Sequence, residues 1–153
     1  MILYRLSQRI YCNDISGRGA ELFGGRWNSK GLSLLYTAES RALAAIEIAV
    51  HTPLGIIQKN YYLTTIEAPD NNAIAQVDIS TLPENWNKKP FTKATQKTGD
   101  DFIKAGKYLI LQVPSATVKG DYNYLINPHH PDFKLVKIKS TEPFDFDERL
   151  FKK

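Results

Sequence analysis

One carboxylate in the sequence is notable for its surroundings. Residues 42–50 read Ala-Leu-Ala-Ala-Ile-Glu-Ile-Ala-Val, and Glu47 is the only charged residue among them. A helix that is apolar on nearly every side is normally buried, and a buried carboxylate is costly unless it is paired or hydrogen-bonded. Glu47 is therefore either half of a structural ion pair, with Arg5 or Arg26 as its partner, or a carboxylate that acts on a substrate in a dry cleft.

Arginine and glycine are concentrated near the start of the chain. Five of the six arginines lie in the first 41 residues, and five of the nine glycines lie between positions 17 and 31. Guanidinium groups bind carboxylates and phosphates through two parallel hydrogen bonds, which a lysine cannot do. This region predicts an anion site, and a flexible loop with solvated charges is the alternative.

The remaining composition excludes several classes. The 153 residues carry a net charge of +4, which fits an anionic ligand but does not by itself indicate nucleic acid. Cys12 has no partner in the chain, so a disulfide scaffold is excluded. His129-His130 lacks the carboxylate or cysteine spacing of a metal site, so we expect a rigid turn and no metal there. The N-terminal residues lack a signal pattern and no apolar run could span a membrane, so we expect a cytoplasmic protein.

The pattern of elements predicts an α+β fold in a single domain over residues 1–153. We expect one helix over 37–51, begun by Thr37 or Ser40 and stopped by Pro53, and a second over 98–105, ended by Gly106. Residues 13–31 read as a loop with a helical turn at 20–23, and 69–97 as an irregular connector. Strands are expected over 2–7, 33–36, 61–67, 107–113, 122–126 and 133–139.

Six segments of the chain form an ordered series of short motifs. They are Leu3-Tyr4-Arg5, Ser16–Ala20 with Gly24–Asn28, Tyr36–Ser40 leading to Leu43, Glu47 and His51, Val113–Ala116, Asn123–Pro128 and His130–Phe133. In this order they resemble the RES-domain family, which is named for its Arg, Glu and Ser. The resemblance runs from about residue 3 to 133, but residues 69–97 match poorly and support nothing beyond a connector. Ser29 departs from the family, which often has proline there, and we expect a looser loop.

The resemblance implies a fold like that of ADP-ribosyltransferases, with central mixed β-sheets flanked by short helices. It also implies the toxin half of a bacterial toxin–antitoxin pair, which breaks NAD⁺ at the nicotinamide–ribose bond by phosphorolysis or hydrolysis. The implied partner is an Xre-type helix-turn-helix antitoxin that blocks the active site. Direct contact with nucleic acid or membrane is not implied, and the complex leaves room for a toxin homodimer.

The resemblance also implies catalytic roles. Glu47 would stabilise the positive charge that develops on the ribose as nicotinamide leaves. Tyr36 would stack on nicotinamide, and Ser115 would donate to a ribose hydroxyl or a phosphate. Arg26 would bind the pyrophosphate.

The remaining implied contacts bind NAD⁺ without taking part in the chemistry. Arg5 would share the pyrophosphate with Arg26. Gly24 and Gly25 would let backbone N–H groups approach the ligand. Asn127 would donate to the ligand or, alternatively, cap the Asn-Pro turn.

Three other functions remain open. A protein-modifying ADP-ribosyltransferase would use the same site. A ribonuclease-type toxin would use the lysine-rich stretch 88–107, whose net charge is +4 but which has few aromatic residues for stacking. A non-enzymatic binding module would use Glu47 only as a structural ion pair.

Overall fold

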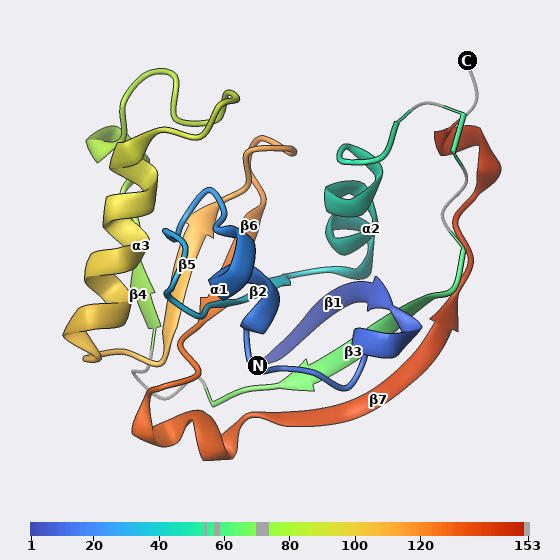
Figure 1. Ribbon diagram of the computed structural model, residues 1–153, viewed down its shortest axis with the longest axis horizontal. Helices are drawn as coiled ribbons and strands as arrows, with labels where there is room; N and C mark the ends of the chain where they lie inside the picture. Colours follow the sequence, from blue (N-terminus) through green and yellow to red (C-terminus); the bar gives the residue numbers. More distant parts are fainter. Residues whose placement is uncertain (54, 57–58, 70–73, 152–153) are drawn as a thin grey trace.

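Seven strands form one mixed sheet in the order β4-β5-β6-β2-β1-β3-β7 (Figure 1). The computed structural model describes residues 1–53, 55–56, 59–69 and 74–151. Of the strand pairs in these residues, β4 and β5 are parallel and the others are antiparallel. The strands are β1 (Ile2–Gln8), β2 (Leu35–Ala38), β3 (Tyr61–Glu67), β4 (Ile74–Gln76), β5 (Ile110–Pro114), β6 (Tyr122–Ile126) and β7 (Lys137–Phe144).

The sheet divides into two wings at the contact between β1 and β2. These strands are in register at a single pair, Tyr4 and Ala38, whereas β1 pairs with β3 along its whole length from Ile2 to Gln8. We call β4-β5-β6-β2 the first wing and β1-β3-β7 the second wing. In Figure 1 the two wings diverge, with α3 (Lys93–Ala105) beside the first and α2 (Arg41–Ala49) above their junction.

Side-chain caps define where the two longer helices begin. The Ser40 hydroxyl accepts a hydrogen bond from the Leu43 N–H at 3.0 Å and starts α2. The Thr92 hydroxyl does the same for α3, which ends at Gly106 in the left-handed conformation that glycine adopts readily. The short elements are α1 (Arg18–Phe23) and the 3₁₀ turns η1 (Arg9–Tyr11), η2 (Ile79–Thr81), η3 (Pro131–Leu135) and η4 (Glu148–Leu150).

Two apolar clusters matter most for the site. The first lies beneath α2, where Leu43 and Ala44 pack with Leu6 and Leu63 of the second wing. The second joins the loop after α1 to α3 and the first wing, and it consists of Trp27, Leu34, Trp86, Phe102, Ile103, Leu111, Val113 and Leu125. Burying these side chains fixes α2 against one wing and the 24–29 loop against the other.

The fold confirms the α+β class, and the strand expectations over 61–67 and 122–126 match β3 and β6. The helix expected over 37–51 begins later, because Thr37 belongs to β2 and donates its hydroxyl hydrogen to the Tyr124 carbonyl oxygen. The final strand begins at Lys137 rather than 133, because Pro131 starts the turn η3, which His130 caps.

The interpretation of residues 69–97 as a bare connector is wrong. This range contains β4, η2 and the first turns of α3. The short strand was missed because three residues carry little periodicity, and its pairing with β5 is a contact distant in sequence. Among the described residues, no helix is long and apolar enough to cross a membrane.

Candidate functional site

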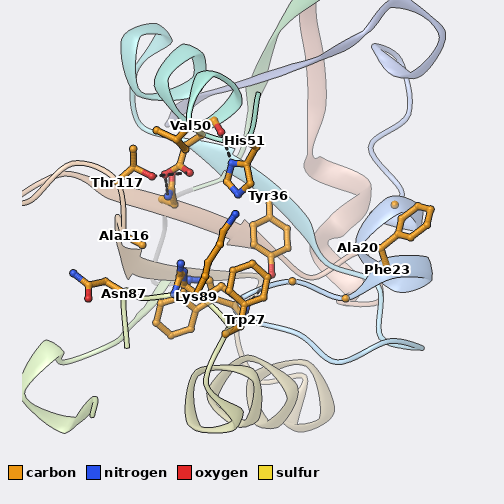
Figure 2. Close-up of a pocket in the computed structure, with 17 residues that line it drawn as sticks. Ala20, Phe23, Trp27, Tyr36, Val50, His51, Asn87, Lys89, Ala116 and Thr117 are labelled. Atoms are coloured by element: carbon orange, nitrogen blue, oxygen red, sulfur yellow. Dashed lines mark hydrogen bonds between the residues drawn. The ribbon is translucent and has the colours of Figure 1, made fainter. Parts of the chain in front are cut away.

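A cavity of about 850 Å³ lies between α1, the 24–27 loop, the C-terminal end of α2 and the segments 87–91 and 116–117 (Figure 2). Its walls combine aromatic rings with polar and charged groups. Glu47, Arg26 and Tyr36, three residues that the sequence singled out, line it together with Gly24 and Gly25. The sequence therefore predicted five of the lining residues, although they come from three separate segments of the chain.

Three neutral side chains hold the Glu47 carboxylate. The Asn123 amide donates to Oε1 at 2.8 Å, and the Ser115 hydroxyl donates to the same oxygen at 3.2 Å. The Thr117 hydroxyl donates to Oε2 at 3.1 Å. These hydrogen bonds satisfy the carboxylate without neutralising its charge, which remains available to a ligand in the cavity.

The structural ion pair that the sequence left open is not formed. Within the described residues, neither Arg5 nor Arg26 makes a salt bridge with Glu47. No salt bridge among the described residues therefore occupies the Glu47 carboxylate at the cavity wall, where it can act on a developing cation.

The hydrogen bonds of the Ser115 hydroxyl direct it at Glu47. Its buried Oγ accepts hydrogen bonds from the backbone N–H groups of Thr117 and Val118, at 3.1 and 3.0 Å, and donates its proton to Glu47. A hydroxyl that already accepts two N–H groups has one direction left for its proton. Ser115 thus aims at the carboxylate and is not among the residues that line the cavity.

Tyr36 is fixed through its hydroxyl. The oxygen donates to Asn28 Oδ1 at 2.7 Å and accepts from the Trp27 N–H at 3.1 Å, which leaves the ring as part of the cavity wall. The buried Asn28 amide also donates to the carbonyl oxygens of Ala20, Ser29 and Leu32. Asn28, which the sequence analysis did not single out as a site residue, therefore ties Tyr36 to the whole 20–32 loop.

The two glycines beside Arg26 have a different role from the one expected. The Gly24 N–H donates to the Ala20 carbonyl and the Gly25 N–H donates to the Asn28 carbonyl, so both bonds are made within the protein. A Cβ at Gly25 would lie 2.6 Å from the Tyr36 hydroxyl. The absence of a side chain at position 25 makes room for Tyr36.

Arg26 lines the cavity and also anchors its wall. Its Nη1 donates to the carbonyl oxygens of Trp86 at 2.5 Å and Lys88 at 3.1 Å, and its guanidinium lies over the Phe91 ring at 4.8 Å from the centroid. Burial lowers the pKa of Arg26, and the negative charge of Glu47 opposes that shift.

Arg5 and Asn127 lie outside the main cavity. Arg5 lines an adjoining cavity of about 190 Å³, which Tyr36, Glu47 and Asn123 also line, and its Nη1 donates to Ser7 Oγ and the Tyr11 carbonyl. Asn127 is buried, and its amide oxygen accepts from the His129 N–H at 3.0 Å. Asn127 therefore adopts the turn-capping geometry that was its alternative role.

Further lining residues were missed by the sequence reasoning. Thr117 directly follows the Val113–Ala116 segment and Asn123 begins the Asn123–Pro128 segment, and these positions in the family-like segments were the available signal. The His51 ring, which the resemblance named without a role, lines the cavity. Its Nδ1 lies 2.7 Å from the Glu47 carbonyl oxygen, and because a carbonyl only accepts, Nδ1 is the donor. Asn87, Lys89 and Phe91 come from the poorly matching range 69–97 and carried no signal.

The loop around Ser29 is anchored, contrary to the expectation that this departure loosens it. The Ser29 N–H donates to Asp100 Oδ1 at 2.8 Å, and its hydroxyl donates to Oδ2 at 2.6 Å. Proline has no N–H and could make neither bond. Ser29 therefore fastens the 24–29 loop to α3, which also binds it through Gln96.

Tyr36 should make stability fall in alkaline solution. Burial raises its pKa above the ordinary value of about 10, so the folded protein keeps the phenolic proton while the unfolded chain loses it. Its contribution is fully present below pH ~10 and is lost as the pH rises above that value. We expect urea denaturation at pH 8 and pH 10.5 to show a smaller loss of unfolding free energy in Tyr36→Phe than in wild type. An equal loss in both proteins would contradict this coupling.

The fold and site define an α+β protein with a two-winged sheet and a single carboxylate on the wall of a large, partly aromatic cavity. A family model described as RES domain matches residues 2–147. The chain belongs to the RES domain family.

Relatives that align over nearly the whole chain are consistent with this family assignment. The chain is 38% identical to the Prs ADP-ribosylating toxin of Sphingobium sp. (strain YBL2) over 144 residues, which cover 92% of this chain and 89% of the relative. It is 36% identical to the Toxin Res of Photorhabdus laumondii, covering 99% and 98% of the two chains. A chain in the crystal structure of the M. tuberculosis MbcT–MbcA toxin–antitoxin complex superposes with a TM-score of 0.72 at 20% identity, covering 98% of this chain and 86% of that one, and so shares the fold.

Proposed function

We propose that this protein is the toxin of a bacterial toxin–antitoxin pair and that it consumes NAD⁺ in the cytoplasm by cleaving the nicotinamide–ribose bond. The observation that carries the proposal is Glu47, a carboxylate held by three neutral donors on the wall of a cavity that also contains cations and aromatic rings. A relative named as an ADP-ribosylating toxin supports the choice of NAD⁺, because NAD⁺ is the usual donor of ADP-ribose.

The geometry suits this chemistry. As the C–N bond breaks, neutral nicotinamide leaves with the bonding electrons and the ribose becomes an oxocarbenium-like cation. The carboxylate of Glu47, which forms no salt bridge among the described residues, stabilises that cation in a partly water-excluded site. Tyr36 offers a fixed ring against which the nicotinamide can stack, and Ser115 orients Glu47. Asn123 and Thr117 complete the orientation of the carboxylate.

Cations and aromatic groups suit the rest of the dinucleotide. Arg26 provides donors near the pyrophosphate while it anchors the 86–91 segment. Arg5 contributes its positive charge from the adjoining cavity, which Glu47 and Tyr36 also line. Gly25 acts indirectly, by leaving room for Tyr36. Asn127 also acts indirectly, by capping the turn that follows β6. We assign no metal to the site; among the described residues no three His, Cys, Asp or Glu side chains are grouped to hold one.

The acceptor of ADP-ribose distinguishes two candidate reactions. Water or phosphate would give free ADP-ribose or ADP-ribose 1″-phosphate, whereas a protein acceptor would carry the ADP-ribose covalently attached. The second reaction, transfer to a protein, is favoured by the name of the Sphingobium relative.

The open cavity mouth is also the place where we expect the antitoxin, of the Xre helix-turn-helix type, to bind and exclude NAD⁺, by analogy with the toxin–antitoxin complex that shares the fold.

One experiment tests the function. Purified, antitoxin-free protein is incubated with NAD⁺, with and without phosphate, and the products are identified by mass. Nicotinamide with ADP-ribose indicates hydrolysis, nicotinamide with ADP-ribose 1″-phosphate indicates phosphorolysis, and a labelled protein band after addition of cell extract indicates transfer. If no nicotinamide is released under any condition, the protein is not an NAD⁺-consuming enzyme.

A further inference from the structure

Lys89 is a solvent-exposed cation on the cavity wall, and no carboxylate in the described part of the chain pairs with it. It lines the cavity, and among the described residues no acidic side chain forms a salt bridge with it. Figure 2 shows its side chain extending from the 86–91 segment into the cavity, toward the side where Tyr36 and His51 lie. Most surface lysines point into bulk water, so a lysine directed into a concave site with an acidic wall requires an explanation.

Arg26 is committed to holding the segment that carries Lys89. Its Nη1 donates to the carbonyl oxygens of Trp86 and Lys88, which precede Lys89 in the chain, and its guanidinium stacks on Phe91, which follows. The Trp86 ring is buried 6.0 Å from the Trp27 ring. The segment is thus fixed on both sides of Lys89.

We propose that Lys89 is the main phosphate-binding cation of this cavity, and that Arg26 is the positioning residue that presents it. This inference rests on the proposed function, because it assigns the diphosphate of NAD⁺ to this wall. An ammonium group is a compact charge with three rotatable donors, and it can reach either phosphate. The Phe91 ring lies 5.9 Å from Nζ and shields one side of the cation from water, which strengthens its attraction to an anion.

The assignment predicts a specific kinetic signature. The diphosphate lies away from the C–N bond that breaks, and its contacts are the same in the substrate and the transition state. Losing such uniform binding raises KM and leaves kcat unchanged. A residue that only maintained the fold would change both, and would affect substrates with and without phosphate alike.

The test compares Lys89→Met with Lys93→Met, a control at the exposed start of α3 that does not line the cavity. We expect Lys89→Met to raise KM for NAD⁺ about tenfold with kcat within twofold of wild type, and Lys89→Arg to restore most of the affinity. Cleavage of nicotinamide riboside, which has no phosphate, should be equally efficient in wild type and Lys89→Met. ADP-ribose, measured by calorimetry, should bind about tenfold more weakly to Lys89→Met.

The outcomes separate this inference from the proposed function. If wild type consumes NAD⁺ and Lys89→Met has an unchanged KM, Lys89 does not bind phosphate and the proposed function stands. If Lys89→Met cleaves NAD⁺ and nicotinamide riboside with equally reduced efficiency, the inference is also overturned. If wild type binds ADP-ribose through Lys89 and releases no nicotinamide from NAD⁺, the proposed function fails and the phosphate site stands.

Discussion

Glu47→Gln should lower the rate of nicotinamide release from NAD⁺ by about 10²–10³-fold with little change in KM, since removing one well-placed electrostatic group from an active site costs this much. The variant keeps the shape of the side chain and an oxygen that can accept from Asn123 and Ser115. It loses the negative charge, whose effect is largest when the ribose becomes cationic. We expect the loss in kcat, measured by release of labelled nicotinamide.

The fold should survive this change. The variant keeps neutral hydrogen bonds from Asn123 and Ser115, but its amide nitrogen cannot accept from the Thr117 hydroxyl, so we expect its unfolding free energy to fall by about 2 kcal/mol. Glu67→Gln is the control, because Glu67 lies at the end of β3, where it pairs with Lys139 on the surface and does not line the cavity. Wild-type turnover by a folded Glu47→Gln protein would show that this carboxylate is not catalytic.

Gly99→Ala should lower the unfolding free energy by about 2–3 kcal/mol, since an added methyl group in a packed core forces backbone shifts of this cost. A Cβ at this position of α3 would lie within 2.7 Å of the Trp27 carbonyl carbon and closer still to its oxygen. These are backbone atoms, which cannot turn aside. The 24–29 loop would have to leave α3, so we also expect loss of activity through displacement of Arg26 and Tyr36. Urea denaturation and NAD⁺ turnover measure the two effects.

Gly19→Ala is the matched control for stability. Gly19 lies in α1, and no atom lies within 4 Å of the Cβ it would acquire. Alanine is favoured over glycine inside a helix, so we expect Gly19→Ala to be neutral or to stabilise by up to about 1 kcal/mol. If Gly99→Ala were as stable as this control, α3 would not be packed against the Trp27 backbone.

Local signals in the sequence predicted the parts of the fold that local chemistry determines. The high content of Tyr, Thr and Ile in Tyr61–Glu67 predicted β3, and Gly106 predicted the end of α3. The isolated charge in residues 42–50 pointed to Glu47, and the structure places that residue on the cavity wall. In each case the physical cause acts within a few residues along the chain.

Contacts between distant segments explain what the sequence could not predict. Arg26 bonds to Trp86 across 60 residues, and Ser29 bonds to Asp100 across 71. Lys89 lies in the lysine-rich stretch 88–107, but nothing in the sequence distinguishes it from the other lysines of that stretch, and only the fold brings it to the cavity wall. The hydrogen bonds of Thr117 and Asn123 to Glu47 were likewise hidden, because they depend on how the fold places α2 next to β6 and the turn before it.

Because the junction between β1 and β2 is narrow, the hydrogen bonds of Glu47 also hold the two wings of the sheet together. Backbone bonding hardly joins the two wings there, and α2 is packed mainly on the second wing through Leu43 and Ala44. The donors to Glu47 come from β6 and from the turn between β5 and β6, which belong to the first wing. The Glu47 carboxylate thus links the two wings through its hydrogen bonds. A shift of one wing against the other would therefore move the carboxylate oxygens that we expect to meet the ribose.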